Sequence, residues 1–297
     1  SYPLKVGSGL AVPLTLPTYM SGGNHLPSDD VIIRRFLHSC YYKMDASKTT
    51  IELFFSIRAA SPEIINFRDP DTPQMQAQLR IVNMAQYGIS GNRSIWIWQL
   101  NDPGLDTYDY LQDARMFFMT LDAWLLSNKE FYESDIVLMD VKDITLKFIT
   151  KFNVSVAKKL SKFQEEAMPI RLKGVHVVNA PPFIDKVYGL MKPFLKQDMS
   201  DMIHFHSPKS DTLYKYLSKE DLPMDYGGTK PSLSEYMQLT FDRLEAHNNI
   251  WRVIFTLLLN KLLKKKETLG TCLQLTLNFC AAFPLKGLRR LATRSAI

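Results

Sequence analysis

The chain of 297 residues is 46% hydrophobic and carries a formal net charge of +6 at pH 7. This length and apolar content suit a globular protein with a sizeable core and exclude a disordered or fibrous chain. The positive charge is local, because nine lysines and arginines but only one acid, Glu267, follow residue 250. Basic residues gathered at one end of a chain argue against nucleic-acid recognition, which uses a basic surface on the folded domain.

Three cysteines, Cys40, Cys272 and Cys280, are present, and no two of them form a CxxC pair. This number and spacing predict neither a disulfide framework nor a structural zinc site, and they favour a reducing compartment. Three prolines interrupt the apolar stretch over residues 1–23, which has no signal-peptide pattern, and polar side chains dilute residues 269–285 below a spanning helix. A soluble, monomeric, cytoplasmic protein is therefore expected.

Residues 1–27 contain glycines and prolines without a helical period, so an irregular arm is predicted. A helix is predicted to begin after Ser28, whose hydroxyl can cap it, with two aspartates in the first turn. A second helix is expected from about Ala46 to Ala60, and the sequence SPEIINFRDPDTP then breaks it. Residues 28–75 are thus predicted to form a small helical module.

Residues 76–247 alternate between patterns typical of strands and patterns typical of helices. Strands are predicted at RIVNMA, SIWIWQL, IVLMDV, KGVHVVN and MIHFHS. Helices are predicted over 108–127, mainly over 144–166, over 183–192 and at DTLYKYL. This alternation predicts an α/β fold in which a sheet is packed with helices.

Motifs that would carry chemistry are weak in this chain. The GSG sequence at Gly7–Gly9 follows no predicted strand and lacks the third glycine of a dinucleotide loop. His204 and His206 share one face of a predicted strand, as two metal ligands would, but no third ligand lies at a suitable spacing. Asp140 and Asp143 mark a strand exit more simply than a catalytic pair. We expect no enzyme, no metal and no cofactor; a metal-dependent hydrolase using the two histidines is the catalytic alternative.

Large apolar side chains are more frequent than one face of a sheet requires. They fall on three helical segments and the turn that follows one of them, which together predict a hydrophobic ligand cavity. The predicted lining is Phe117, Phe118, Leu121, Leu125, Leu160, Phe163, Met168, Ile170, Phe183, Val187, Leu190 and Met191. The alternative for each of these residues is a place in an ordinary core.

The helix expected over 183–192 follows the double proline Pro181–Pro182 and ends at Pro193. Because proline lacks a backbone donor, the ends of this helix are not tied into neighbouring hydrogen-bond ladders, and we expect it to move as a unit. Lys186 and Lys192 flank its apolar stripe and suit anionic lipid headgroups. The pattern predicts a gate that meets membranes; a fixed surface helix is the alternative.

The stretch PIRLKGVHVVNAPPFIDKVYGLMKPFLKQDMSDMIHFH, followed by LPMDYGG at 222–228, resembles the CRAL-TRIO lipid-binding family. It looks most like the insect members of the branch that includes tocopherol and retinaldehyde carriers, over roughly residues 25–245. The resemblance implies a CRAL-TRIO domain at 76–247, with a mixed sheet flooring a hydrophobic pocket covered by helices, after the all-helical module. It implies one bound tocopherol, retinoid, carotenoid, sterol-like molecule or phospholipid, no catalysis, and transfer between membranes through a gate helix at Pro182–Met191.

The resemblance also implies a basic cluster that holds phosphoinositide phosphates near the gate. Arg58, Arg171 and Lys173 match three of its cations, whereas Asp198 and Met202 replace two others. A weakened phosphoinositide site is therefore expected, and the alternative function is a phosphoinositide-binding regulator that presents a lipid to partner proteins. The resemblance does not cover residues 248–297, which are predicted to be a basic, apolar extension.

Overall fold

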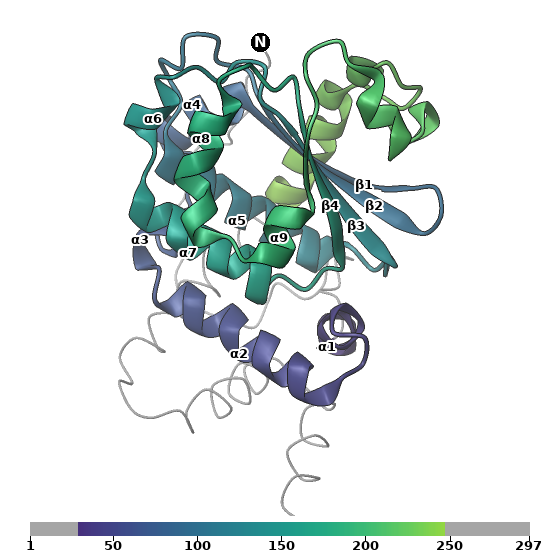
Figure 1. The fold of residues 1–297 in the computed structure, drawn as a ribbon. Helices are drawn as coiled ribbons and strands as arrows, with labels where there is room; N and C mark the ends of the chain where they lie inside the picture. The colour runs from purple at the N-terminus through teal and green to yellow at the C-terminus, as the bar shows by residue number, and fades with distance from the viewer. Residues whose placement is uncertain (1–28, 247–297) are drawn as a thin grey trace, which may run out of the picture.

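The computed structural model describes residues 29–246, and the side chains from Val31 onward. The predicted N-terminal arm, the Ser28 cap and the extension at 248–297 lie outside the described residues. Within the described part, a helical module precedes a five-stranded sheet that carries helices on one face (Figure 1).

The helical module contains four helices. They are α1 (Asp29–Ser39), α2 (Met44–Ala59), α3 (Pro62–Ile65) and α4 (Pro73–Ile81). The first two agree with the predicted helices, but the segment expected only to break the second one contains two more. Each of these begins with a proline, which is favourable at the first helical position because its missing N–H has no intrahelical partner there. The Thr72 hydroxyl also caps α4 by accepting from the Met75 amide at 3.3 Å.

The sheet is mixed, as the resemblance implied. Its strands are β1 (Val82–Ile89), β2 (Arg93–Leu100), β3 (Ser134–Asp140), β4 (Leu172–Val178) and β5 (Ile203–Phe205), in the spatial order β1-β2-β3-β4-β5. The first two form an antiparallel hairpin, and the remaining neighbours are parallel. The hairpin turn uses positive φ at Gly91 and Asn92, residue types that tolerate this conformation.

Helices cover one face of the sheet, and short 3-10 turns cover the other. The first group is α5 (Tyr110–Ser127), α6 (Phe148–Lys151), α7 (Val154–Glu166), α8 (Ile184–Met191) and α9 (Gln197–Asp201), with η2 (Lys192–Phe194) between the last two. The second group is η3 (Asp211–Lys215), η4 (Lys219–Asp221) and η5 (Met224–Tyr226). A helix over 233–246 follows and lies against β1. The segment DTLYKYL is therefore a 3-10 turn, where an α-helix was predicted.

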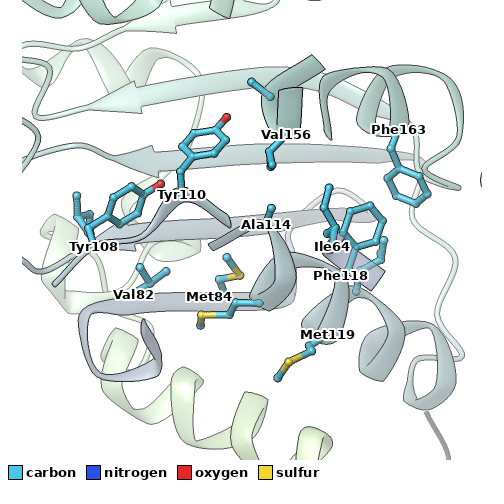
Figure 2. Packing of buried hydrophobic residues seen from close by; sticks show 14 of the residues in the cluster. Ile64, Val82, Met84, Tyr108, Tyr110, Ala114, Phe118, Met119, Val156 and Phe163 are labelled. Atoms are coloured by element: carbon cyan, nitrogen blue, oxygen red, sulfur yellow. The ribbon is translucent and has the colours of Figure 1, made fainter. Parts of the chain in front are cut away.

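Two apolar cores result, because strand residues alternate between the two faces of the sheet. The larger core joins the helical module to α5 and α7, and Figure 2 shows Ile64, Phe118 and Phe163 within it. The smaller core packs Ile97 and Leu138 from the opposite face of the sheet against Leu213 and its neighbours. On the helix-covered face of the sheet, the part near the helical module is a packed core, and the rest encloses a cavity.

Candidate functional site

A cavity of about 320 Å³ lies between the sheet and its helical layer. All five strands contribute to its floor, for example through Met84, Trp96, Met139, Val177 and Phe205, and its walls come from α5, α7, α8, α9 and the helix at 233–246. Five strands at ~4.8 Å spacing make this floor roughly 19 Å wide. Its volume is that of a site for a small molecule, and its lining is predominantly apolar.

Half of the residues predicted for the cavity line it. They are Phe117, Leu160, Met168, Ile170, Val187 and Met191, which come from α5, α7, the segment after α7, and α8. The sequence prediction missed the floor, although the alternation of the strands placed Trp96, Trp98 and Met139 on one face. Strand alternation was the signal that would have found these residues.

Phe118, Leu121, Leu125 and Phe163 were predicted for the cavity but lie in the larger core instead. The rings of Phe118 and Phe163 are 4.6 Å apart, and Phe163 also contacts Phe54 of α2 at 5.5 Å. Helix α5 is apolar on two sides, one toward the cavity and one toward the helical module. Periodicity identifies both sides but does not tell which of them is a cavity wall.

The apolar stripe of α8 is rotated relative to the prediction. Ile184, Val187, Tyr188 and Met191 line the cavity at the spacing of one helix face. Phe183 packs half-buried against the larger core at the start of the helix, and Leu190 is half-exposed outside the lining. The prediction placed the stripe too early because it counted Phe183 as part of the helical period.

Few specific contacts hold α8. Val187 is its one fully buried residue, and the residue before the helix provides no side-chain cap. The Tyr110 hydroxyl donates to the Met191 sulfur at 3.7 Å, and the Tyr188 ring meets Phe205 at 5.3 Å. Beyond η2, Lys196 joins this region to α7, since its Nζ lies 2.7 Å from a Glu166 oxygen.

A buried acid lies at the α5 side of the cavity. Asp113 accepts hydrogen bonds from Trp98 Nε1 and from the Tyr108 hydroxyl, each at 3.0 Å. Burial raises the pKa of Asp113 to about 6, although these hydrogen bonds favour its ionised form. The carboxyl group therefore holds Trp98 and Tyr108 in the wall of the cavity, and both of its oxygens already accept hydrogen bonds.

Arg58, predicted to bind a phosphate near the gate, is instead fully buried. Its guanidinium lies 2.8 Å from the Asp122 carboxylate and between the rings of Phe54, Phe118 and Phe163. Arg68 binds the same carboxylate. This ion pair joins the helical module to α5, so Arg58 is not available to a headgroup.

Arg171 and Lys173 do lie close together, but only Lys173 is exposed, since Arg171 is buried with 6% of its surface accessible. The Arg171 guanidinium is 4.2 Å, and the Lys173 Nζ 5.4 Å, from the centre of the Tyr41 ring. Arg171 is already occupied, because it binds the Glu133 carboxylate and donates to the His38 carbonyl at 2.8 Å. Two of the three predicted cations are thus adjacent, and a carboxylate competes for one of them.

The strand histidines lie on the sheet face opposite the cavity. His176 Nδ1 and His206 Nε2 share a hydrogen bond at 3.1 Å, and His206 Nδ1 is 2.8 Å from the Thr212 hydroxyl. Burial, together with the charges that His206 and His204 carry when protonated, lowers the pKa of His176 to about 4. Within residues 29–246, no three His, Cys, Asp or Glu side chains are arranged to hold a metal ion.

Comparison with known proteins gives two family matches along the chain. Residues 90–228 match the CRAL/TRIO domain, and residues 15–75 match the Pinta-like UBA domain. Among the described helices, none is both long and apolar enough to cross a bilayer.

Several known proteins are similar to this chain. Alpha-tocopherol transfer protein-like of Homo sapiens is 24% identical over 205 residues, 69% of this chain and 60% of that protein. Clavesin-2 of Homo sapiens is 22% identical over 212 residues, 69% of this chain and 64% of that protein. The match thus covers less than two thirds of the length of these relatives. The crystal structure of Sfh5 superimposes with a TM-score of 0.42 at 13% identity, over 70% of this chain and 74% of that chain.

The match at 90–228 begins within the β1–β2 turn and ends just after η5, so it contains strands β2 to β5 and the helices that wall the cavity from α5 to α9. The sheet order and the apolar cavity agree with it. The chain therefore carries a CRAL-TRIO domain, the domain of a family that binds and transfers lipophilic molecules, behind a UBA-like helical module.

Proposed function

We propose that this protein binds one lipophilic molecule in the cavity and transfers it between membranes, with no covalent step. The observation that carries the proposal is the apolar cavity of about 320 Å³ enclosed between the sheet and α5, α7 and α8. Burial of about 400 Å² of ligand surface at ~25 cal/mol/Å² contributes on the order of 10 kcal/mol before the entropy costs of binding. This gain is of the same order as those costs, so apolar burial is the main contribution that favours loading.

The proposed route of entry is displacement of α8. Its support is that this helix covers the cavity with four side chains, while a single one of its residues, Val187, is fully buried. Moving α8 exposes apolar surface, which a membrane can cover in place of the sheet. A helix held mainly by apolar contacts suits this exchange, because lipid tails replace those contacts at little cost.

A surface beside α8 supports peripheral membrane binding. Leu146, Ile149 and Val154, at or next to α6, are 46%, 41% and 58% exposed. Helices α6 and α8 lie side by side (Figure 1), and the exposed Lys186 and Lys192 lie on and just after α8. Apolar side chains flanked by lysines favour the interface of an anionic membrane.

The second candidate is a regulator that binds phosphoinositides at Arg171 and Lys173. The adjacency of these two cations at Tyr41 favours it. Burial of Arg58 with Asp122 and the pairing of Arg171 with Glu133 weaken it. We therefore rank headgroup binding below carriage of a lipophile.

Transfer of NBD-labelled cholesterol and NBD-labelled phosphatidylcholine between vesicles tests the first proposal with the full chain. Leu160→Trp fills the cavity and is expected to abolish uptake of both probes, because Leu160 is a wall residue. Leu239→Trp is the matched control, because Leu239 is 50% exposed outside the cavity. A folded Leu160→Trp protein that loads and transfers like the control would contradict carriage in this cavity.

A further inference from the structure

One end of the cavity contains a buried amide side chain without a hydrogen-bond partner among the described residues. Gln86 on β1 lines the cavity beside Trp96, its cross-strand neighbour, and is 6% exposed. In the part of the chain that the structure describes, neither its amide nitrogen nor its amide oxygen has a hydrogen-bond partner. Buried polar groups are hydrogen-bonded in nearly all native proteins, so this amide points to a ligand.

A cation lies at the same end. Arg243, on the helix at 233–246, lines the cavity. Its Nη1 donates to the backbone carbonyl oxygen of Gln86 at a long 3.5 Å. No carboxylate among residues 31–246 lies within ion-pair distance of Arg243. Burial lowers the pKa of Arg243, and the neighbouring Tyr132 phenol favours its charged form. The guanidinium is thus partly desolvated without a compensating anion.

The other polar side chains of the lining mostly have partners. Asp113 accepts from Trp98 and Tyr108, and Glu165 accepts from the Lys196 amide at 3.1 Å. The two threonines of the lining donate to backbone carbonyls. Ser161 also has a buried hydroxyl without a partner in the described chain, but it lies on α7, which carries no cation into the lining.

We infer that the ligand is an amphiphile whose single oxyanion head, a carboxylate or a phosphate, is received by Arg243 and Gln86. This inference rests on the proposed function, since it names the class of the lipophile carried. A guanidinium donates to an oxyanion through charge-assisted hydrogen bonds, and the Gln86 amide adds a further N–H donor. The head then lies over β1, and the tail extends across the sheet toward β5 and α8.

A purely structural role does not account for Gln86. A buried amide without partners destabilises the folded state, whereas leucine has a similar volume and no polar atoms. Gln86→Leu should therefore leave the melting temperature of the delipidated protein unchanged or raise it. The same substitution should weaken binding of the anionic ligand, so stability and binding are expected to change in opposite directions.

The test uses delipidated full-length protein and its own fluorescence, because Trp96, Trp98 and Trp124 all line the cavity. Palmitate, methyl palmitate, hexadecanol and lysophosphatidate are titrated separately. We expect an anionic probe to bind at least tenfold more tightly than the ester and the alcohol. Arg243→Leu and Gln86→Leu should reduce this preference to less than threefold. Arg80→Leu removes an exposed arginine outside the lining and should keep the preference.

The outcomes separate this inference from the proposed function. Equal binding of acid, ester and alcohol would overturn the oxyanion head and leave carriage of a lipophile intact. No binding of any probe would overturn both. A preference that survives in Arg243→Leu would place the head elsewhere and refute the assignment. If the preference depends on Arg243, the tighter of palmitate and lysophosphatidate identifies the head as a carboxylate or as a phosphate.

Discussion

Helices α2 and α8 both pack on the CRAL-TRIO domain, but different forces hold them. Helix α2 is fixed by Arg58, 1% exposed, which pairs with the fully buried Asp122 of α5. Helix α8 has one fully buried residue, and no salt bridge from residues 31–246 reaches it. A buried charge left without its partner is strongly destabilising, whereas apolar contacts are readily exchanged for lipid. The domain thus has one covering helix fixed by a buried ion pair and another held mainly by apolar contacts.

The largest expected effect comes from breaking the α2 attachment. Asp122→Asn leaves Arg58 and Arg68 buried without their anion, and we expect it to lower the free energy of unfolding by about 3–5 kcal/mol. Urea denaturation of the full chain measures this change. Asp242→Asn is the control, because Asp242 is exposed and, among the described residues, hydrogen-bonds only to Gln238. A loss below about 1 kcal/mol, typical of a surface pair, would show that the ion pair does not fix α2.

Acid is expected to act on strands β4 and β5, whose cavity face α8 covers, and to spare α2. His176 has a pKa of about 4 in the folded protein, below its usual 6.5. Between pH 6.5 and 4 the unfolded chain therefore binds more protons at this site, so its contribution to stability falls as the pH falls, by up to roughly 3 kcal/mol. His176 lies on β4 beside β5, whose Phe205 contacts Tyr188 of α8.

Two carboxyl groups with shifted pKa values also affect how stability depends on pH. Burial alone would raise the pKa of Asp122, but Arg58 and Arg68 lower it below its usual range, so the α2 attachment stays ionised above pH 4. Asp113, with a pKa of about 6, is stabilised by protonation below that pH and offsets part of the loss at His176. Hydrogen exchange at pH 7 and pH 5 should show faster opening of β5 and α8 than of α2. His176→Gln should remove the difference; equal acceleration in both helices would contradict the prediction.

A smaller effect is expected from loosening α8 itself. Val187→Ser removes the one fully buried apolar side chain of the helix, which costs about 1–2 kcal/mol of local stability. Hydrogen exchange of the α8 amides should accelerate, while the urea midpoint of the whole protein changes little. Lys186→Ala, an exposed change on the same helix, is the control. Equal acceleration of exchange across α2 would show that the two helices open together, which would contradict a difference in how firmly they are held.

The smallest expected effect concerns the pair between Lys196 and Glu166. The side chains are 62% and 22% exposed, and such pairs contribute about 0.2–1 kcal/mol. Lys196→Ala should therefore speed release of preloaded NBD-cholesterol by no more than about fivefold, a factor that corresponds to roughly 1 kcal/mol. High salt should remove the difference from the unmodified protein, because the pair is partly solvated. A salt-independent change would assign Lys196 a role other than this ion pair.

The sequence predicted most of the elements because their patterns are local. Strands β2 to β5 and the α8 helix lie within about two residues of the predicted bounds, whereas the first strand was predicted at 80–85 and β1 runs over Val82–Ile89. The segment that was expected to break the second helix does follow its end at Ala59, but its prolines also begin α3 and α4, since the same residue ends one helix and favours the first position of another. A local pattern does not decide between these two roles.

The cavity was harder to predict, because it depends on contacts between distant residues. Phe117 and Phe118 are neighbours in the chain, yet the first lines the cavity and the second packs in the core. Arg58 lies in a motif that resembles a phosphate site, but its partner Asp122 is 64 residues away. Single-sequence periodicity contains no information on such pairings, so it cannot distinguish a surface cation from a buried one.

The edge strand β1 affects the tendency of the protein to aggregate, because an unpaired strand edge can pair with another copy of the chain. The helix at 233–246 occupies the groups that an incoming strand would use: Thr240 donates to the Met84 carbonyl at 2.8 Å, and the Met84 amide contacts the Met237 sulfur at 3.4 Å. The opposite edge, β5, is only three residues long. Both borders of the sheet are thus poor templates for intermolecular β-pairing. The contacts at the β1 edge do not involve α8, so the proposed displacement of that helix would leave this protection against aggregation in place.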